Sequence, residues 1–174
     1  ISPSARMLRY EESFNWLADA GVALPCYNVV TPQPPLQLNE KRNLFKLYAN
    51  DVGLLCAACM ENIQFELLMG NVEVNMGSIL ENAFARNLKS NGFELHYFDS
   101  KKIGELDFVL QKGAGIGLEE IKSGNDFKKH PAMRHALEVK QWKFGESIVF
   151  SKSNVEIDGE ITYLPWYMII FFNN

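Results

Sequence analysis

The segment from residue 105 to residue 124 most constrains the fold, because it contains two short apolar stretches on either side of a glycine-rich turn. The stretches "ELDFVLQKG" and "GIGLEEIKSG" are typical of strands. The intervening "GAGIG" has the glycines that a tight hairpin turn needs. The sequence therefore predicts two adjacent antiparallel strands, which carry Asp107, Glu119, Glu120 and Lys122 among their apolar side chains.

Helices and further strands surround this hairpin between residues 76 and 174. Apolar residues at helical spacing predict a helix in "GSILENAFARNLKSNG", which Gly92 would end. A strand is predicted in "FELHYFDS" and a second helix begins near Pro131. "ESIVFSK" and "ITYLPWYMIIF" predict two more strands. This order predicts a mixed α/β (α+β) domain over residues 76–174.

The front of the chain, residues 1–75, has a different organisation. Helices are predicted in "RMLRYEESFNWLADAGV" and "VGLLCAACMENIQFELLMG". Between them, "VALPCYNVV" and "NLFKLYAND" predict two strands that pair with each other, joined by a proline-rich loop. A helix, a two-stranded wing and another helix predict a winged-helix-like segment. Its acidic character argues against DNA binding through this part.

The composition of the 174 residues is that of a globular protein, with 47% hydrophobic residues and a net charge of -4. That charge argues against unspecific attraction to nucleic acid. No apolar run has the roughly 20 residues needed to cross a bilayer, and no signal peptide is recognisable. We therefore expect no membrane association and a cytoplasmic location. Because the chain starts with Ile1, we also expect it to be a piece of a longer protein.

Three cysteines are too few for a disulfide framework. Cys56 and Cys59 form a CxxC pair, but no second pair completes a zinc site. We expect all three cysteines to be buried thiols.

Four residues of the predicted domain suggest a metal-dependent site. Glu81 lies on its first helix, and Asp107 lies in the hairpin strand before the turn. Glu120 and Lys122, two residues apart on the next strand, share a face, and the hairpin brings them near Asp107. Close carboxylates repel one another unless a cation lies between them, and such oxygen ligands suit Mg²⁺ or Mn²⁺. We therefore predict Glu81, Asp107 and Glu120 as metal ligands, with Asp107, Glu120 and Lys122 catalytic.

Surface charge on an edge strand is the plain alternative for this ExK pair. Other catalytic arrangements are not recognisable. "GAGIG" lacks the lysine of a phosphate-binding loop, and no nucleophile elbow GxSxG exists. His96, His130 and His135 have no metal-ligand spacing, so we expect them to pack or face solvent.

Basic residues after the ExK pair are the first candidates for contact with a phosphate backbone. We select Lys128, Lys129 and Arg134 as possible DNA contacts. The alternative is a solvated helix face.

Nearly the whole chain resembles a known protein family. "GSILENAFARNL", "GELDFVL" and "LEEIKSG", with "LYANDVGLL" upstream, are similar to the C-terminal domain of unassigned function of prokaryotic AAA-type ATPases. That domain resembles the PD-(D/E)xK nuclease superfamily. The resemblance implies a restriction-endonuclease-like mixed sheet flanked by helices. It also implies an ATPase module, with its ATP site, outside this chain as a partner.

The resemblance also implies roles for individual residues. Glu81 matches the helix acid of the superfamily, Asp107 the metal-binding aspartate, and Glu120 with Lys122 the ExK pair. Leu106 stands where some members have proline, a departure that the superfamily tolerates.

Two functional hypotheses follow. The first is a Mg²⁺- or Mn²⁺-dependent nuclease-like domain that hydrolyses phosphodiesters. The second is a catalytically inactive platform that binds DNA or protein and regulates the ATPase. Carboxylates converging with Lys122 in an open cleft would favour the first. A Lys122–Glu120 ion pair under a lid, or an Asp107 that caps a turn, would favour the second. A purely structural domain is a third reading.

Overall fold

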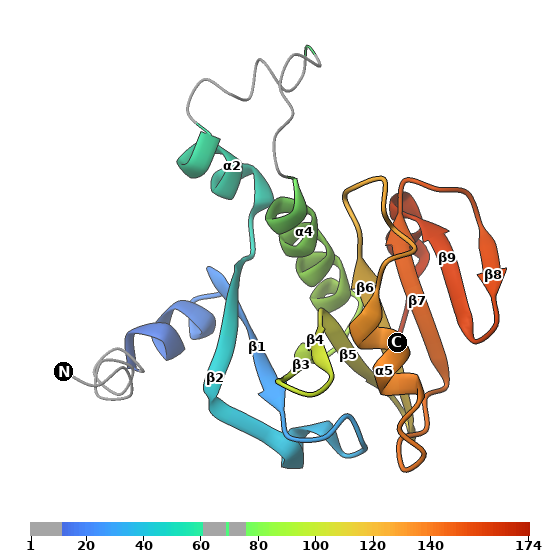
Figure 1. Ribbon diagram of the computed structural model, residues 1–174. Coiled ribbons are helices and arrows are strands. Elements are labelled where there is room, and N and C mark those ends of the chain that lie inside the picture. Colours follow the sequence, from blue (N-terminus) through green and yellow to red (C-terminus); the bar gives the residue numbers. More distant parts are fainter. Residues whose placement is uncertain (1–11, 61–68, 70–75) are drawn as a thin grey trace.

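The computed structural model describes residues 12–60, 69 and 76–174, which form two β-sheets with helices against them (Figure 1). A helix over residues 12–19 precedes the first sheet. The first sheet has four strands in the order β2-β1-β3-β4, and the second has five in the order β5-β6-β7-β9-β8. Parallel and antiparallel pairs occur in both sheets, which confirms the predicted mixed α/β class.

The four-stranded sheet combines the front of the chain with the segment after residue 76. Strands β1 (Ala23–Val29) and β2 (Glu40–Ala49) pair antiparallel, as predicted, with the 3₁₀ helix η1 (Leu36–Asn39) between them. Strand β3 (His96–Ser100) then pairs parallel with β1, and β4 (Gly104–Leu106) pairs antiparallel with β3. The predicted β-wing is therefore part of a sheet that crosses from one proposed segment into the other.

The five-stranded sheet contains the predicted hairpin. Strand β5 (Phe108–Lys112) pairs antiparallel with β6 (Gly115–Ile121), and the turn uses Gly113 at a φ of 58°. Strand β6 then pairs parallel with β7 (Glu146–Ser151). The remaining strands are β9 (Ile161–Pro165), parallel to β7, and β8 (Glu156–Asp158), antiparallel to β9.

Two predicted strands differ in the structure. "ELDFVL" is not one strand, because β4 pairs in the first sheet and β5 in the second, with Asp107 between them. The last predicted strand ends at Pro165, and the 3₁₀ helix η2 (Trp166–Phe171) follows. Proline has no N–H to donate to a sheet ladder, so a strand commonly stops there.

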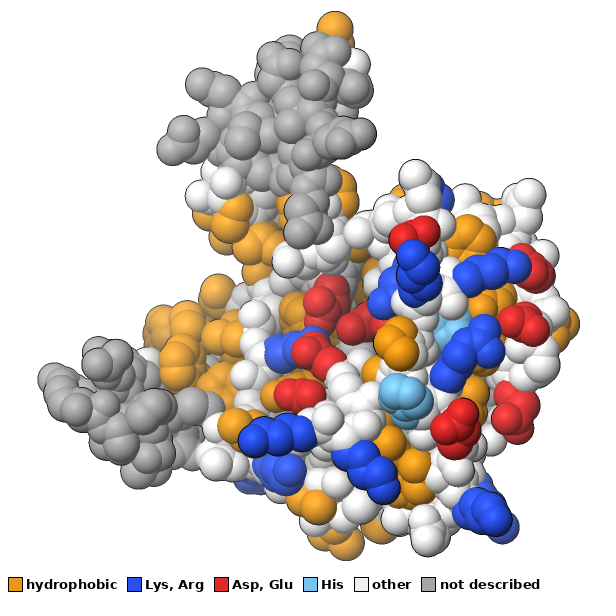
Figure 2. All heavy atoms as spheres, in the orientation of Figure 1, with side chains coloured by type: hydrophobic (Ala, Val, Ile, Leu, Met, Phe, Trp, Pro, Cys, Tyr) orange, Lys and Arg blue, Asp and Glu red, His pale blue; other side chains and the backbone are white. Residues whose placement is uncertain are grey.

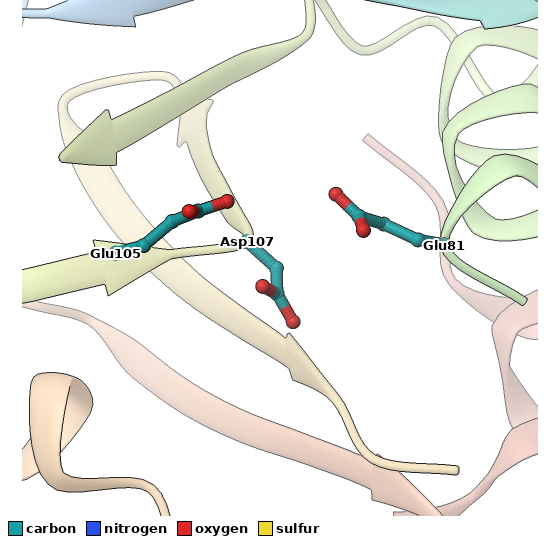
Figure 3. A group of neighbouring side chains, drawn as sticks. All are labelled: Glu81, Glu105 and Asp107. Atoms are coloured by element: carbon teal, nitrogen blue, oxygen red, sulfur yellow. The ribbon is translucent and has the colours of Figure 1, made fainter. Parts of the chain in front are cut away.

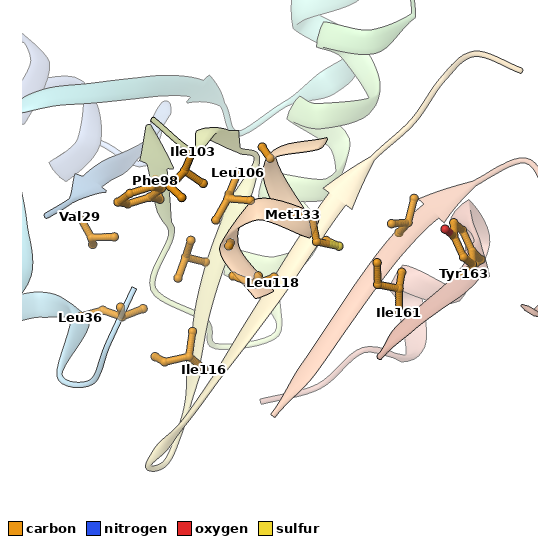
Figure 4. Packing of buried hydrophobic residues seen from close by; sticks show 14 residues of the cluster. Val29, Leu36, Phe98, Ile103, Leu106, Ile116, Leu118, Met133, Ile161 and Tyr163 are labelled. Atoms are coloured by element: carbon orange, nitrogen blue, oxygen red, sulfur yellow. The ribbon is translucent and has the colours of Figure 1, made fainter. Parts of the chain in front are cut away.

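Helices α4 (Gly77–Ser90) and α5 (Pro131–Leu137) cover opposite faces of the five-stranded sheet. Alternate residues of β5 point to opposite faces. Phe108 and Leu110 pack with residues of α4, whereas Val109 packs with residues of α5. Figure 4 shows the buried residues that pack with Val109 on the α5 side of the sheet. Both predicted helices are confirmed, with Gly92 after α4 and Pro131 in the first turn of α5.

Among the residues that the structure describes, the α5-side core consists of fourteen buried residues: Val29, Leu36, Phe98, Ile103, Leu106, Val109, Ile116, Leu118, Ala132, Met133, Ala136, Val149, Ile161 and Tyr163. The α4-side core consists of thirteen: Leu24, Cys26, Tyr48, Phe84, Ala85, Leu88, Phe93, Leu95, Phe108, Leu110, Ile148, Phe150 and Ile169. Each core includes residues of both sheets, so the sheets pack as one body.

Helix α4 is also joined to β2 by the buried side chain of Asn82. Its amide nitrogen donates to the Ala49 carbonyl at 2.8 Å, and its oxygen accepts from the Ala49 N–H at 2.7 Å. The side chain therefore acts like a neighbouring strand for the end of β2.

Replacing Asn82 with alanine leaves both backbone groups of Ala49 without their partner. We expect a loss of about 2–4 kcal/mol in the free energy of unfolding, measured by urea denaturation. Asn87→Ala is the control, because the side chain of Asn87 donates to the Ala83 carbonyl one turn back on the same helix. Equal losses in the two variants would contradict the proposed link to β2.

The proposed division at residues 75 and 76 is partly outside the described residues, and the winged-helix-like segment stays a prediction. Helix α2 (Val52–Met60) covers the described part of the second front helix. Of the cysteines, Cys26 is buried as expected, whereas Cys56 is half-buried and Cys59 is exposed on α2, so the expectation of three buried thiols was wrong. None of the helices among the described residues has the length and apolar content that crossing a membrane requires.

Candidate metal centre

Asp107 occupies the junction where the chain leaves the first sheet and enters the second. Its carboxylate Oδ2 accepts a hydrogen bond from the backbone N–H of Ile121 at 2.8 Å. This bond crosses from the junction to the end of β6, and so fixes the direction of the carboxylate.

Three carboxylates converge at this junction (Figure 3). Glu81 reaches from α4, Glu105 from β4, and Asp107 from the junction, and one oxygen of each lies within 4.8 Å of the others. Acidic side chains gather at the centre of the face shown in Figure 2. We call Glu81, Glu105 and Asp107 the acidic cluster.

Glu105 was not among the predicted ligands. The signal for it was present, because residues two apart on a strand share a face, and Glu105 precedes Asp107 by two. The prediction of a single strand in "ELDFVL" assigned Glu105 and Asp107 to one strand of the hairpin, whereas the chain changes sheet at Asp107.

Glu120 and Lys122 lie beside the acidic cluster. The pairing of Phe108 with Glu119 sets Asp107 opposite Glu120 across the hairpin, as predicted. Lys122 Nζ is 2.6 Å from Glu120 Oε1. Glu120 is only 4% exposed, and within the described residues its Oε2 has no hydrogen-bond partner. Glu120 is not one of the three carboxylates that meet within 4.8 Å, so its role as a direct ligand stays a prediction.

The electrostatics of the site favour an added positive charge. Burial, and then the negative charge of Glu120, raise the pKa of Asp107 to about 7, although the Ile121 N–H acts against this. Burial also raises the pKa of Glu120, and Lys122 opposes the shift. A cation placed among these carboxylates would remove the repulsion that disfavours their ionised forms.

Two side chains of β2 close one side of the acidic cluster. Lys46 Nζ is 2.7 Å from Glu81 Oε1 and 2.5 Å from Glu105 Oε1. The hydroxyl of Tyr48 donates a short hydrogen bond to the same Glu81 oxygen. Burial acts to lower the pKa of Lys46, but its hydrogen bonds to Glu105 and Glu81 outweigh this and raise it. Lys46 is therefore a charged ammonium held between two carboxylates.

Comparison with known proteins places most of this site in one family. The model of "Domain of unknown function (DUF4143)" matches residues 76–169. The chain belongs to the DUF4143 family. The matched segment contains Glu81, Glu105, Asp107, Glu120 and Lys122, whereas Lys46 and Tyr48 lie before it. Searches of curated proteins and of solved structures found no match.

The basic residues predicted to contact DNA belong to the DUF4143 segment, and each has an internal carboxylate partner. Lys128 pairs with Glu156 at 2.5 Å, and Lys129 with Asp126 at 2.7 Å. Arg134 pairs with Asp158 at 3.3 Å. Figure 2 shows acidic side chains interspersed with basic ones on this face. Phosphate contact by these residues would compete with the internal pairs, and it stays a prediction.

The histidines of the DUF4143 segment have structural partners. His96 is buried with Nε2 3.0 Å from Glu40 Oε1, and His130 is buried with Nε2 2.7 Å from the Tyr163 hydroxyl. His135 Nδ1 lies 3.3 Å from the Ile103 carbonyl oxygen. These contacts agree with the expectation that the histidines pack or face solvent.

Proposed function

We propose that the acidic cluster binds Mg²⁺ or Mn²⁺ and that the chain hydrolyses phosphodiester bonds in DNA. The observation that carries the proposal is the convergence of Glu81, Glu105 and Asp107 within 4.8 Å, beside the Glu120–Lys122 pair. Hard carboxylate oxygens are the donors that these cations prefer. The buried Oε2 of Glu120, which has no hydrogen-bond partner in the part of the chain that the structure describes, supports the same fit.

Each residue has a distinct part in this proposal. Asp107, Glu81 and Glu105 would hold the cation, with Glu120 as a ligand directly or through water. A bound cation would polarise the phosphodiester and lower the pKa of a coordinated water. Lys122, whose side chain is 29% exposed, would release Glu120 Oε1 and donate to the developing negative charge on phosphate.

The wider setting is part of the same proposal. An ATPase module elsewhere in a longer protein would hold ATP and position this domain on DNA in the cytoplasm. Lys128, Lys129 and Arg134 would exchange their internal carboxylates for DNA phosphates. Binding should then fall steeply with salt, since released counterions contribute much of the affinity of such contacts.

An inactive platform for DNA or protein is the second candidate function. Lys122 already forms an ion pair with Glu120, and Asp107 already holds the Ile121 N–H. These are the contacts expected if the site has a structural role. This candidate predicts no cleavage under any metal condition.

A plasmid-nicking assay with Mn²⁺ or Mg²⁺ tests the proposal. We expect the wild type to nick supercoiled DNA, EDTA to stop it, and Asp107→Asn to lower the rate at least about 100-fold, because a ligand charge is lost while the shape is kept. Glu94→Gln, an exposed change in an ion pair with Lys89 that lies outside the acidic cluster and outside the proposed DNA contacts, should leave the rate within about twofold.

Circular dichroism would confirm that the two variants fold alike. Cleavage that survives Asp107→Asn would contradict the assignment of the site. No cleavage by the wild type with either metal, together with no Mn²⁺ binding by calorimetry, would favour the inactive platform.

A further inference from the structure

Lys46 already places a positive charge where the acidic cluster would receive a cation. Its ammonium contacts Glu81 Oε1 and Glu105 Oε1 at 2.7 and 2.5 Å, so it bridges two of the three carboxylates. Tyr48, on the same face of β2, donates to the same Glu81 oxygen. These contacts satisfy the oxygens that a hard divalent cation would need as direct ligands.

We infer that Lys46 is an internal competitor for the divalent cation, so that metal binding at the acidic cluster requires its ammonium to leave. This inference rests on the metal-binding part of the proposed function. Its basis is the position of a cationic side chain from β2, outside the segment that the DUF4143 model matches. The metal site and its competitor thus come from different parts of the chain.

The surroundings of Lys46 allow the exchange. Its side chain is 24% exposed, and β2 is the edge strand of its sheet, so solvent is accessible without unfolding. A lysine ammonium on a flexible four-carbon stem can turn away with little rearrangement of the backbone. Its ammonium also lies 5.1 Å from the centroid of the Tyr97 ring, which offers a neighbouring place for a cation.

Electrostatic repulsion makes the competition effective. An ammonium and a divalent cation that share the same carboxylate oxygens lie within a few ångströms of each other, where their repulsion is large in a half-buried site. Asp107 and Glu120, which Lys46 does not contact within hydrogen-bond distance among the described residues, would still attract the metal. Removing the ammonium should therefore strengthen metal binding.

Titration calorimetry with MnCl₂ at pH 8 tests the inference on the whole chain. We expect Lys46→Met to bind Mn²⁺ at least about tenfold more tightly than the wild type. Lys41→Met is the matched control, because it removes the same charge from the same strand, and its affinity should stay within about twofold of the wild type. Equal or weaker binding by Lys46→Met would overturn the inference, since Lys46 would then organise the ligands rather than compete.

If Lys46→Met does not fold, the thermal stability of a second variant in the presence of Mn²⁺ tests the same inference. The alternative is Lys46→Gln, because Glu105→Gln would weaken the hold on Lys46 but would also remove a metal ligand. The melting temperature of Lys46→Gln should rise more on addition of Mn²⁺ than the melting temperature of the wild type does. Equal shifts would overturn the inference while leaving the metal site in place. No Mn²⁺ binding by the wild type, Lys46→Met or Lys46→Gln would overturn both this inference and the proposed function.

Discussion

Glu119→Gln is expected to stabilise the protein at pH 8 and to change its stability little at pH 4.5. Glu119 is 1% exposed on β6, and neither of its carboxylate oxygens has a hydrogen-bond partner within the described residues. It lies against Gly117, where an added Cβ would come within 2.7 Å of Glu119 Oε1. The nearby Glu146 already forms an ion pair with Lys112 at 2.6 Å.

The direction of the pH effect follows from proton binding. Burial, and then the charge of Glu146, raise the pKa of Glu119 well above its ordinary value of 4.5, whereas Lys112 acts to lower it. Above pH 4.5 the unfolded chain loses this proton while the folded chain keeps it. The free energy of unfolding therefore falls as pH rises from 4.5 toward the folded pKa. Glutamine keeps the shape of the neutral acid and removes the proton linkage.

Urea denaturation of both proteins at several pH values from 4.5 to 8 measures this effect. We expect the variant to exceed the wild type by on the order of 2 kcal/mol at pH 8. Glu160→Gln, a change of an exposed carboxylate, is the control and should give parallel curves. A difference that does not vary with pH would show that Glu119 is charged and compensated in the folded protein.

Phe150→Ala is expected to cause the largest loss of stability among the variants considered. Phe150 is fully buried on β7, and its ring meets that of Phe84 edge-on at 4.9 Å between centroids. The ring of Phe172 lies 6.1 Å away at 90°. The side chain thus holds together the sheet, α4 and the chain after η2. Its removal should lower the free energy of unfolding by about 3–5 kcal/mol, because a cavity remains.

Thermal unfolding followed by circular dichroism would show this loss as a drop in the melting temperature on the order of 10 °C. Phe171→Ala is the matched control. Phe171 is 66% exposed on η2, so the same truncation there should change stability by less than about 0.5 kcal/mol. A loss below about 1 kcal/mol for Phe150→Ala would mean that the α4-side core closes over the missing ring.

Local sequence patterns were enough to predict the hairpin, α4 and α5. Glycines between two apolar stretches predict a turn wherever they occur, and helical spacing with Gly92 or Pro131 marks helix ends through backbone conformation alone. The division of "ELDFVL" between two sheets at Asp107 was not predictable in this way. Strand pairing depends on partners distant in the chain, and here β4 bonds to β3 while β5 bonds to β6.

In the candidate site, too, some contacts were predictable from local spacing and others depend on the packing of distant segments. Local spacing was enough to predict that Asp107, Glu120 and Lys122 would be neighbours, because a short hairpin and a two-residue repeat bring them together. Glu81 was predicted to join this site from its helix, but the contact of Glu105 with this site and the position of Lys46 between Glu81 and Glu105 became visible only in the folded chain. Those contacts join α4, β4 and β2, and no local pattern encodes them, because they arise from the packing of a helix and two sheets around shared apolar cores.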